Sequence, residues 1–142
     1  MKKSAYSLDK IAPRLYTYFA MGYNAWVKAM NNQGIKSSDL SQLQLEMGIE
    51  FKDLRNALNL PANFLNTSGE APLPAHAIDN LHELVHLYVE GYNVWEDREK
   101  FNKWMTRKNP YLFDATPIEA CMTRIGLHEV RNEIDRVKFG IS

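Results

Sequence analysis

Apolar residues recur at spacings of three and four along most of the chain, which is the period of an α-helix. The clearest pattern covers residues 75–95, with the predicted buried positions Ile78, Leu81, Val85, Tyr88, Tyr92 and Trp95. An aromatic-rich pattern over residues 13–31 predicts one long helix, with Leu15, Tyr18, Phe19, Gly22, Tyr23, Trp26 and Met30 on one face. No segment shows sustained apolar–polar alternation, so we expect an all-α fold with essentially no sheet.

The middle of the chain contains two short helical patterns separated by a tight turn. Gly48 is placed to end one helix, and Phe51, Leu54 and Leu58 then share a face of the next. The turn at residues 59–61 contains a proline, and residues 62–66 are long enough for one further helical turn. This arrangement predicts a helix-turn-helix-like unit.

The last third of the chain begins with an Asn-Pro break and contains two short helices with clear end signals. Thr116, Pro117 and Glu119 form a predicted capping box with proline at the first helical position. We expect Gly126 to end that helix in a left-handed conformation. The second helix carries Val130, Ile134 and Val137 at helical spacing and is predicted to end at Gly140.

This C-terminal pattern resembles the toxin-binding domain of Xre/ParS-type bacterial antitoxins, which neutralise RES-domain toxins. The matching residues are Trp104, Pro110, Leu112, Thr116, Pro117, Ile118, Thr123, Gly126, Val130, Ile134, Val137 and Gly140. The family usually has a glycine shortly after the matching leucine, whereas this chain has Phe113 and Asp114 there. The resemblance therefore leaves open how that turn is built.

The resemblance implies an antitoxin that inhibits by binding, with no catalysis and no cofactor. It divides the chain into an N-terminal aromatic-rich segment (residues 1–36), a degenerate helix-turn-helix region (residues 37–95) and a toxin-binding domain (residues 96–142). The first segment is either core or an interface between two copies of the chain, so a homodimer through the N-terminal helices is expected.

The resemblance also implies which residues contact the toxin. RES-domain toxins consume NAD, and such antitoxins press their last helix and tail against the toxin's NAD-binding cleft. In this chain the corresponding candidates are Arg131, Asp135, Arg136, Lys138, Gly140, Ile141 and Ser142.

The distribution of charge argues against DNA binding by the helix-turn-helix region. The whole chain has no net charge, but residues 1–33 carry +4, residues 34–95 carry −5 and residues 96–142 carry +1. A region at −5 repels the phosphate backbone, and only Asn63 and Asn66 remain as candidates for contacting bases. A DNA-binding autorepressor stays open as the first alternative function.

Residues 82–86 read HELVH, which matches the zinc-hydrolase signature H-E-x-x-H. His82 and His86 would share one helix face and could bind one zinc ion, with Glu83 as general base. A catalytic site also needs a third protein ligand, which the sequence does not identify. The zinc hydrolase is the second alternative, and we expect no metal site.

The remaining composition fits a cytoplasmic protein. Cys121 is the one cysteine, so no internal disulfide can form, and it lies among apolar residues of a predicted helix. No apolar run approaches the length needed to cross a membrane, and the first residues lack the apolar core of a signal peptide.

Overall fold

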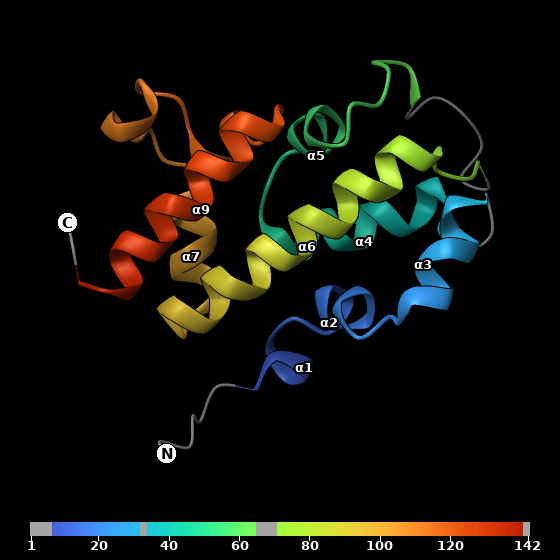
Figure 1. Cartoon of the computed structure of the whole chain (residues 1–142), viewed down its shortest axis with the longest axis horizontal. Coiled ribbons are helices and arrows are strands. Elements are labelled where there is room, and N and C mark those ends of the chain that lie inside the picture. Colours follow the sequence, from blue (N-terminus) through green and yellow to red (C-terminus); the bar gives the residue numbers. More distant parts are fainter. Residues whose placement is uncertain (1–6, 32–33, 65–70, 141–142) are drawn as a thin grey trace.

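The helix α6 (Ala75–Trp95) runs through the middle of the molecule in this computed structural model, with other helices on several of its sides (Figure 1). The structure describes residues 7–31, 34–64 and 71–140. Within these ranges the other elements are α1 (Leu8–Ile11), α2 (Pro13–Phe19), α3 (Tyr23–Met30), α4 (Ser37–Met47), α5 (Phe51–Ala57), α7 (Arg98–Met105), the 3-10 helix η2 (Pro110–Leu112), α8 (Pro117–Ala120) and α9 (Arg124–Lys138).

The all-α expectation is confirmed, since the described residues form nine α-helices and no strand. One isolated antiparallel bridge joins Lys36 to Pro72 and brings the start of α4 beside the segment that leads into α6. None of the helices within the described ranges is long and apolar enough to cross a membrane.

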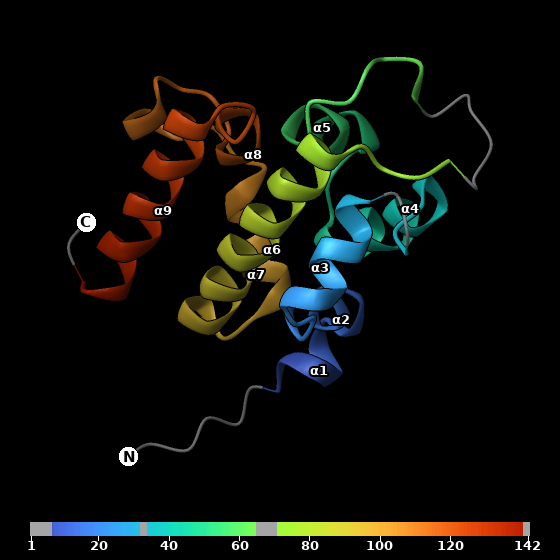
Figure 2. The same cartoon turned by 45° about the vertical axis from the view of Figure 1, so that its right-hand side comes forward.

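Two sets of helices pack on α6. The N-terminal helices α2 and α3 lie on one side of it, and α9 lies on another (Figures 1 and 2). The boundaries of α6 agree with the predicted range of residues 75–95, and all the predicted stripe is buried except Trp95, which is half-buried. Because most of its circumference is covered, α6 connects the N-terminal and C-terminal parts of the core.

An aromatic cluster joins the end of α6 to α7. The rings of Tyr88, Tyr92 and Phe101 meet edge to face, with centroids 5.3 to 5.8 Å apart. Gly91 lies between the two tyrosines in sequence and leaves room for the Phe101 ring, which a β-carbon at this position would meet at 2.1 Å. This glycine near the end of α6 is therefore needed for close helix packing rather than for backbone freedom.

The single long helix predicted for residues 13–31 is wrong, because the chain forms α2 and α3 with a break between them. Gly22 has extended backbone angles and precedes the first residue of α3. The break changes the direction of the chain, so Leu15, Tyr18 and Trp26 are buried while Tyr23 is 82% exposed. A stripe that is continuous in sequence is thus divided between the core and the surface.

The structure describes only part of the predicted helix-turn-helix unit, which stays a prediction. Gly48 ends α4 with a φ of 68°, as expected, and α5 follows. After α5, Asn59 adopts a φ of 58°, and Phe64 N donates a hydrogen bond to Pro61 O at 3.0 Å, which closes a turn. The end of the predicted helical turn at residues 62–66 lies outside the described residues.

Replacing Gly91 with alanine is expected to lower the free energy of unfolding by about 2 kcal/mol. Alanine is favoured over glycine inside a helix by about 1 kcal/mol, but overpacking against a filled core costs about 1–3 kcal/mol or more. The steric cost prevails because the β-carbon would overlap the buried Phe101 ring. Urea unfolding followed by circular dichroism measures the difference.

The matched control is Gly22→Ser, at a glycine where an added β-carbon would meet no other atom within 4 Å. Serine is a favourable residue before a helix, so the free energy of unfolding should change by less than about 0.5 kcal/mol. Equal stability of Gly91→Ala and the wild-type chain would show that the α6–α7 contact is not tightly packed.

Candidate partner-binding site

The C-terminal helices are held in place by a capping box that agrees with the sequence prediction. Glu119 N donates to the Thr116 hydroxyl at 3.2 Å, and Thr116 N donates to the Glu119 carboxylate at 2.9 Å. The hydrogen bonds from Thr116 hold the pKa of Glu119 below its ordinary value. Pro117 occupies the first helical position. This box fixes the direction of α8, which lies between α5 and α9 in Figure 2.

The predicted role of Gly126 is wrong. It lies inside the first turn of α9, which is capped by Thr123, whose hydroxyl accepts a hydrogen bond from Gly126 N at 2.9 Å. Its backbone is not left-handed. A β-carbon on Gly126 would lie 1.8 Å from the carbonyl oxygen of Ala120 at the end of α8. The glycine therefore allows α8 and α9 to approach each other closely.

An ion-pair bridge attaches α9 to α6. The α9 side chains Val130 and Ile134 are fully buried. Beside them, the guanidinium of Arg131 lies 3.8 Å from a carboxylate oxygen of Glu83 and 3.5 Å from one of Glu90. The toxin-contact candidate Arg131 thus lies against α6.

Asp135 also faces α6, where it contacts Glu90. Burial and the nearby charge of Asp135 raise the pKa of Glu90, and this effect outweighs the opposing charges of Arg131 and Lys138. Glu90 thus interacts with both Arg131 and Asp135 of α9. Arg131 and Asp135 therefore belong to the contact that positions α9.

The other candidates lie at the exposed end of α9. Arg136 Nε is 3.1 Å from the carboxylate of the largely buried Glu133, and its guanidinium lies 5.7 Å from the centre of the Tyr111 ring. Lys138 is exposed, and Gly140 ends the helix with a φ of 72°, as predicted. Candidates Ile141 and Ser142 lie outside the described residues. The structure thus brings Arg136, Lys138 and Gly140 together on one accessible end.

A tightly hydrogen-bonded turn at residues 109–115 lies beside this end. Asn109 is buried and anchors the turn: its carbonyl oxygen accepts hydrogen bonds from Leu112 N at 2.9 Å and Asp114 N at 3.0 Å. Its side-chain oxygen accepts one from Tyr111 N at 2.9 Å, and its own N donates to Ala115 O at 3.0 Å. These four bonds and the buried Leu112 side chain fix the turn.

Two residues of this turn adopt left-handed backbone angles without being glycine. The φ values are 56° at Phe113 and 61° at Asp114, and such a conformation costs a residue with a β-carbon about 1–2 kcal/mol. The turn therefore keeps the shape that a glycine would favour, although the chain has none there. Sequence reasoning noted the missing glycine but assigned no binding role to this turn.

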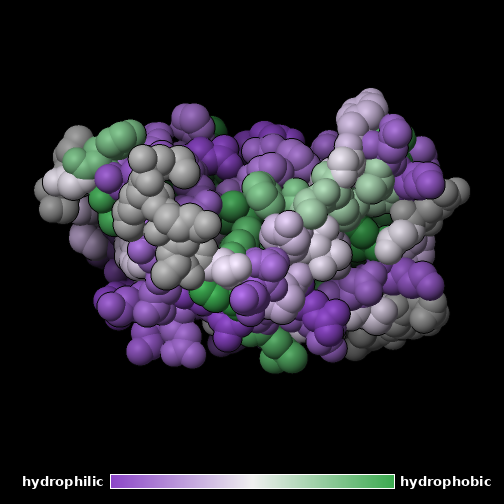
Figure 3. Space-filling view, turned by 90° about the horizontal axis from the view of Figure 1, so that it is seen from below, coloured by the Kyte–Doolittle hydropathy of each residue, from purple (hydrophilic) through white to green (hydrophobic). Residues whose placement is uncertain are grey.

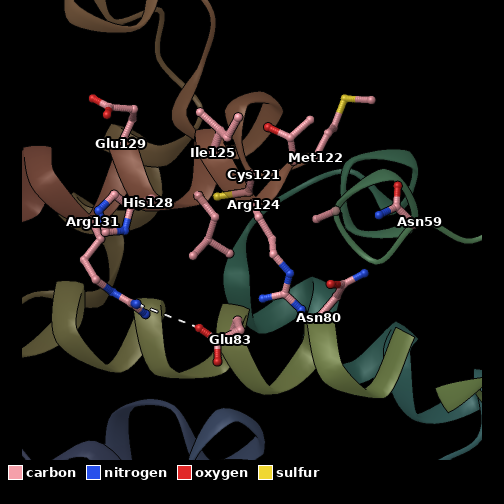
Figure 4. A pocket seen from close by; sticks show the side chains of 13 residues that line it. Asn59, Asn80, Glu83, Cys121, Met122, Arg124, Ile125, His128, Glu129 and Arg131 are labelled. Carbon is pink, nitrogen blue, oxygen red and sulfur yellow. Dashed lines mark ion pairs between the residues drawn. The ribbon is translucent and has the colours of Figure 1, made fainter. Parts of the chain in front are cut away.

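A pocket of ≈ 480 Å³ opens between α6 and the first half of α9 (Figure 4). Its cationic side chains come from α9, and Figure 4 shows Arg131 directed at Glu83 and Arg124 extending toward Asn80. Cys121 lines the base, where burial raises the pKa of its thiol to about 12. A thiol that stays protonated is a poor nucleophile, so this pocket offers binding groups rather than a catalytic cysteine.

The histidines of the HELVH segment pack against aromatic rings of the N-terminal helices. The His82 and His86 ring centres are 4.4 Å apart, His82 meets Trp26 at 4.9 Å, and His86 meets Phe19 at 5.3 Å. The Glu83 carboxylate lies 3.5 Å from His82 Nδ1 and 3.8 Å from the guanidinium of Arg131. Among the residues that the structure describes, no group of three or more His, Cys, Asp or Glu side chains could hold a metal ion.

The two DNA-contact candidates follow α5 in the sequence. Asn63 is exposed on the turn after α5, and Asn66 lies outside the described residues. Contact with DNA by these residues stays a prediction, to which the charge of −5 over residues 34–95 remains unfavourable.

Lowering the pH is expected to weaken the attachment of α2 and α3 to α6. Burial, and then the charge of His82, lower the pKa of His86, while Glu83 opposes the shift and Arg131 adds to it. The folded chain therefore favours neutral His86. The associated stability is complete above about pH 6.5 and is lost as the pH falls through the lowered value, because the unfolded chain takes up the proton first.

Thermal unfolding at about pH 7.5 and about pH 5.5 measures this effect. In His86→Gln the difference between the two unfolding midpoints should shrink, whatever the variant's absolute stability. The control His128→Gln changes an exposed histidine of α9 and should keep the wild-type difference. An undiminished difference in His86→Gln would assign the pH dependence to other groups.

Comparison with known proteins gives one family match. Residues 90–140 match the family model described as the antitoxin Xre/MbcA/ParS C-terminal toxin-binding domain. The matched range begins within the last turns of α6 and includes α7, the turn at residues 109–115, α8 and α9. A search of curated proteins finds none that matches the chain.

Proposed function

We propose that the chain is an antitoxin whose residues 90–140, which match the Xre/MbcA/ParS C-terminal toxin-binding domain, neutralise a RES-domain toxin by covering its NAD-binding cleft. The family match carries this proposal. The model describes a toxin-binding domain, so inhibition in this proposal is stoichiometric.

The exposed end of α9 supplies the contacts in this mechanism. Arg136 and Lys138 place cationic groups beside Gly140, and Ile141 and Ser142 follow. A cleft shaped for a dinucleotide attracts cations where it would hold phosphates, so these side chains compete for that space. Arg131 and Asp135 act indirectly, because their contacts with α6 keep α9 in position.

Deleting residues 138–142 is expected to abolish inhibition while the chain remains folded. The buried contacts of α9 end at Ile134, so its packing on α6 survives the deletion. The measurement is growth of cells that express the RES-domain toxin expected in the neighbouring reading frame, together with their NAD level. The deleted chain should fail to restore either one, although its circular dichroism spectrum is unchanged.

The double variant Arg136→Ala/Lys138→Ala separates charge from chain length in the same assay. Its matched control is Lys10→Ala/Lys28→Ala, which removes two exposed cations from the N-terminal half. The first pair should weaken inhibition and the second should not. Full protection by the chain lacking residues 138–142 would contradict a mechanism in which the tail covers the cleft.

We also propose that the N-terminal segment, residues 1–36, joins two copies of the chain. Three aromatic side chains on α2 and α3 remain exposed: Tyr16, Phe19 and Tyr23. Figure 3 views the molecule from the side of α1 and α2 and shows apolar residues gathered in its middle and right, between polar ones. Aromatic residues exposed on neighbouring helices favour association through a two-fold contact.

Light scattering after size-exclusion chromatography tests the dimer. The wild-type chain should elute at about twice its mass of 16.4 kDa. The variant Phe19→Ser/Tyr23→Ser should shift toward the monomer, because it removes apolar contact area at the proposed interface. The control Ile125→Ser changes an exposed apolar residue of α9 and should stay dimeric. A monomeric wild-type chain would contradict the interface.

A further inference from the structure

Phe113 projects into solvent from a turn that is otherwise fixed. Its residue surface is 99% exposed, so the ring contributes nothing measurable to the core. Its backbone is left-handed with a φ of 56°, a conformation that glycine would adopt without strain. The four hydrogen bonds centred on Asn109 hold this conformation in place. The chain therefore retains a strained, unburied aromatic residue where a smaller one would be more stable.

A strained residue that gives no internal benefit points to a role outside the molecule. We infer that Phe113 is an aromatic anchor that inserts into an apolar pocket on the toxin, and that the rim of that pocket is acidic. This inference rests on the proposed function. It adds to the proposed function a second contact, beside the end of α9, that helps the chain select its own toxin.

The surroundings of the turn indicate the charge of the rim. A pocket of ≈ 270 Å³ lies between the turn and the end of α9, and Arg107, Lys108 and Arg136 are among its lining residues. Glu133, the acidic residue in that lining, is largely buried and paired with Arg136. Arg107 and Lys108 are exposed and form no ion pair with other described residues. A partner surface that carries carboxylates would complement Arg107 and Lys108, to which the exposed Asp114 beside Phe113 adds one opposing charge.

A second aromatic residue of the turn, Tyr111, also supports a binding role for this surface. Tyr111 is 62% exposed and lies under the guanidinium of Arg136 at 5.7 Å. The contact positions Arg136 near the turn, so an aromatic and a cationic group are both already ordered before binding. Preordered aromatic and arginine side chains are the groups that most often dominate the affinity of protein interfaces.

The test measures binding of purified full-length chain to the RES-domain toxin, by calorimetry at about 0.15 M salt. Phe113→Gly should weaken binding by about 30-fold or more, as expected for a central anchor, while its thermal midpoint is equal to or above that of the wild type. Phe113→Tyr should bind within about threefold of the wild type, because it restores the ring. A purely structural role would instead lower the midpoint.

Two further variants complete the design. Arg107→Glu/Lys108→Glu should slow association and reverse its dependence on salt, because the proposed rim is acidic. Leu45→Ala, on α4, is the matched control at an exposed apolar residue outside both proposed interfaces and should leave toxin affinity unchanged.

The outcomes separate the inference from the proposed function. If the wild-type chain does not bind the toxin, the proposed function fails and the anchor with it. If the wild type binds and Phe113→Gly binds within about threefold of it, the tail mechanism stands and the anchor is overturned. A change of mass in Phe113→Gly during light scattering, with toxin affinity intact, would assign Phe113 to contacts between copies and would also overturn the inference.

Discussion

The burial of α6 on several sides is the constraint on which the rest of the structure depends. The helices α2 and α3 pack against it, and Arg131 of α9 reaches across to Glu83 and Glu90. A helix of 21 residues that is covered in this way cannot shift without disturbing both ends of the chain. It therefore provides a rigid base for α9, and a binding helix with a rigid base loses less freedom when it meets a partner.

The sequence predicted the features that depend on local patterns, and it failed where the role of a glycine depends on a tertiary contact. The range of α6, the capping box of Thr116 and Glu119, and the stop at Gly48 follow from local patterns, and the structure agrees with them. The roles of Gly22 and Gly126 could not be predicted from local patterns. A glycine can end a helix, precede one or make room for a neighbouring backbone, and only the partner at Ala120 O distinguishes the third use for Gly126. That partner is a tertiary contact.

The core-facing positions of α9 could be predicted from the sequence, but not the contacts that α9 makes with α6. Helical spacing placed Val130 and Ile134 in the core and Gly140 at the end of the helix. It could not show that Arg131 lies over two carboxylates of α6, since Glu83 and Glu90 are more than forty positions earlier in the sequence. The two histidines of HELVH do share one face of α6, but they pack on Trp26 and Phe19. These two residues belong to α3 and α2, and the sequence did not predict the break between those helices. Phe113 lies in a turn outside the helices, so the helical spacing of apolar residues could not identify it as an exposed site residue.

The central claim is that the C-terminal helices bind a toxin while the remaining helices support them. Hydrogen exchange of the backbone amides, compared between the free chain and its complex with the RES-domain toxin, tests this claim most directly. The account predicts slower exchange on toxin binding at residues 107–115 and toward the end of α9, with little change in α4 and α5. Protection centred on α4, α5 and the turn at residues 61–64, or no protection at all, would contradict it.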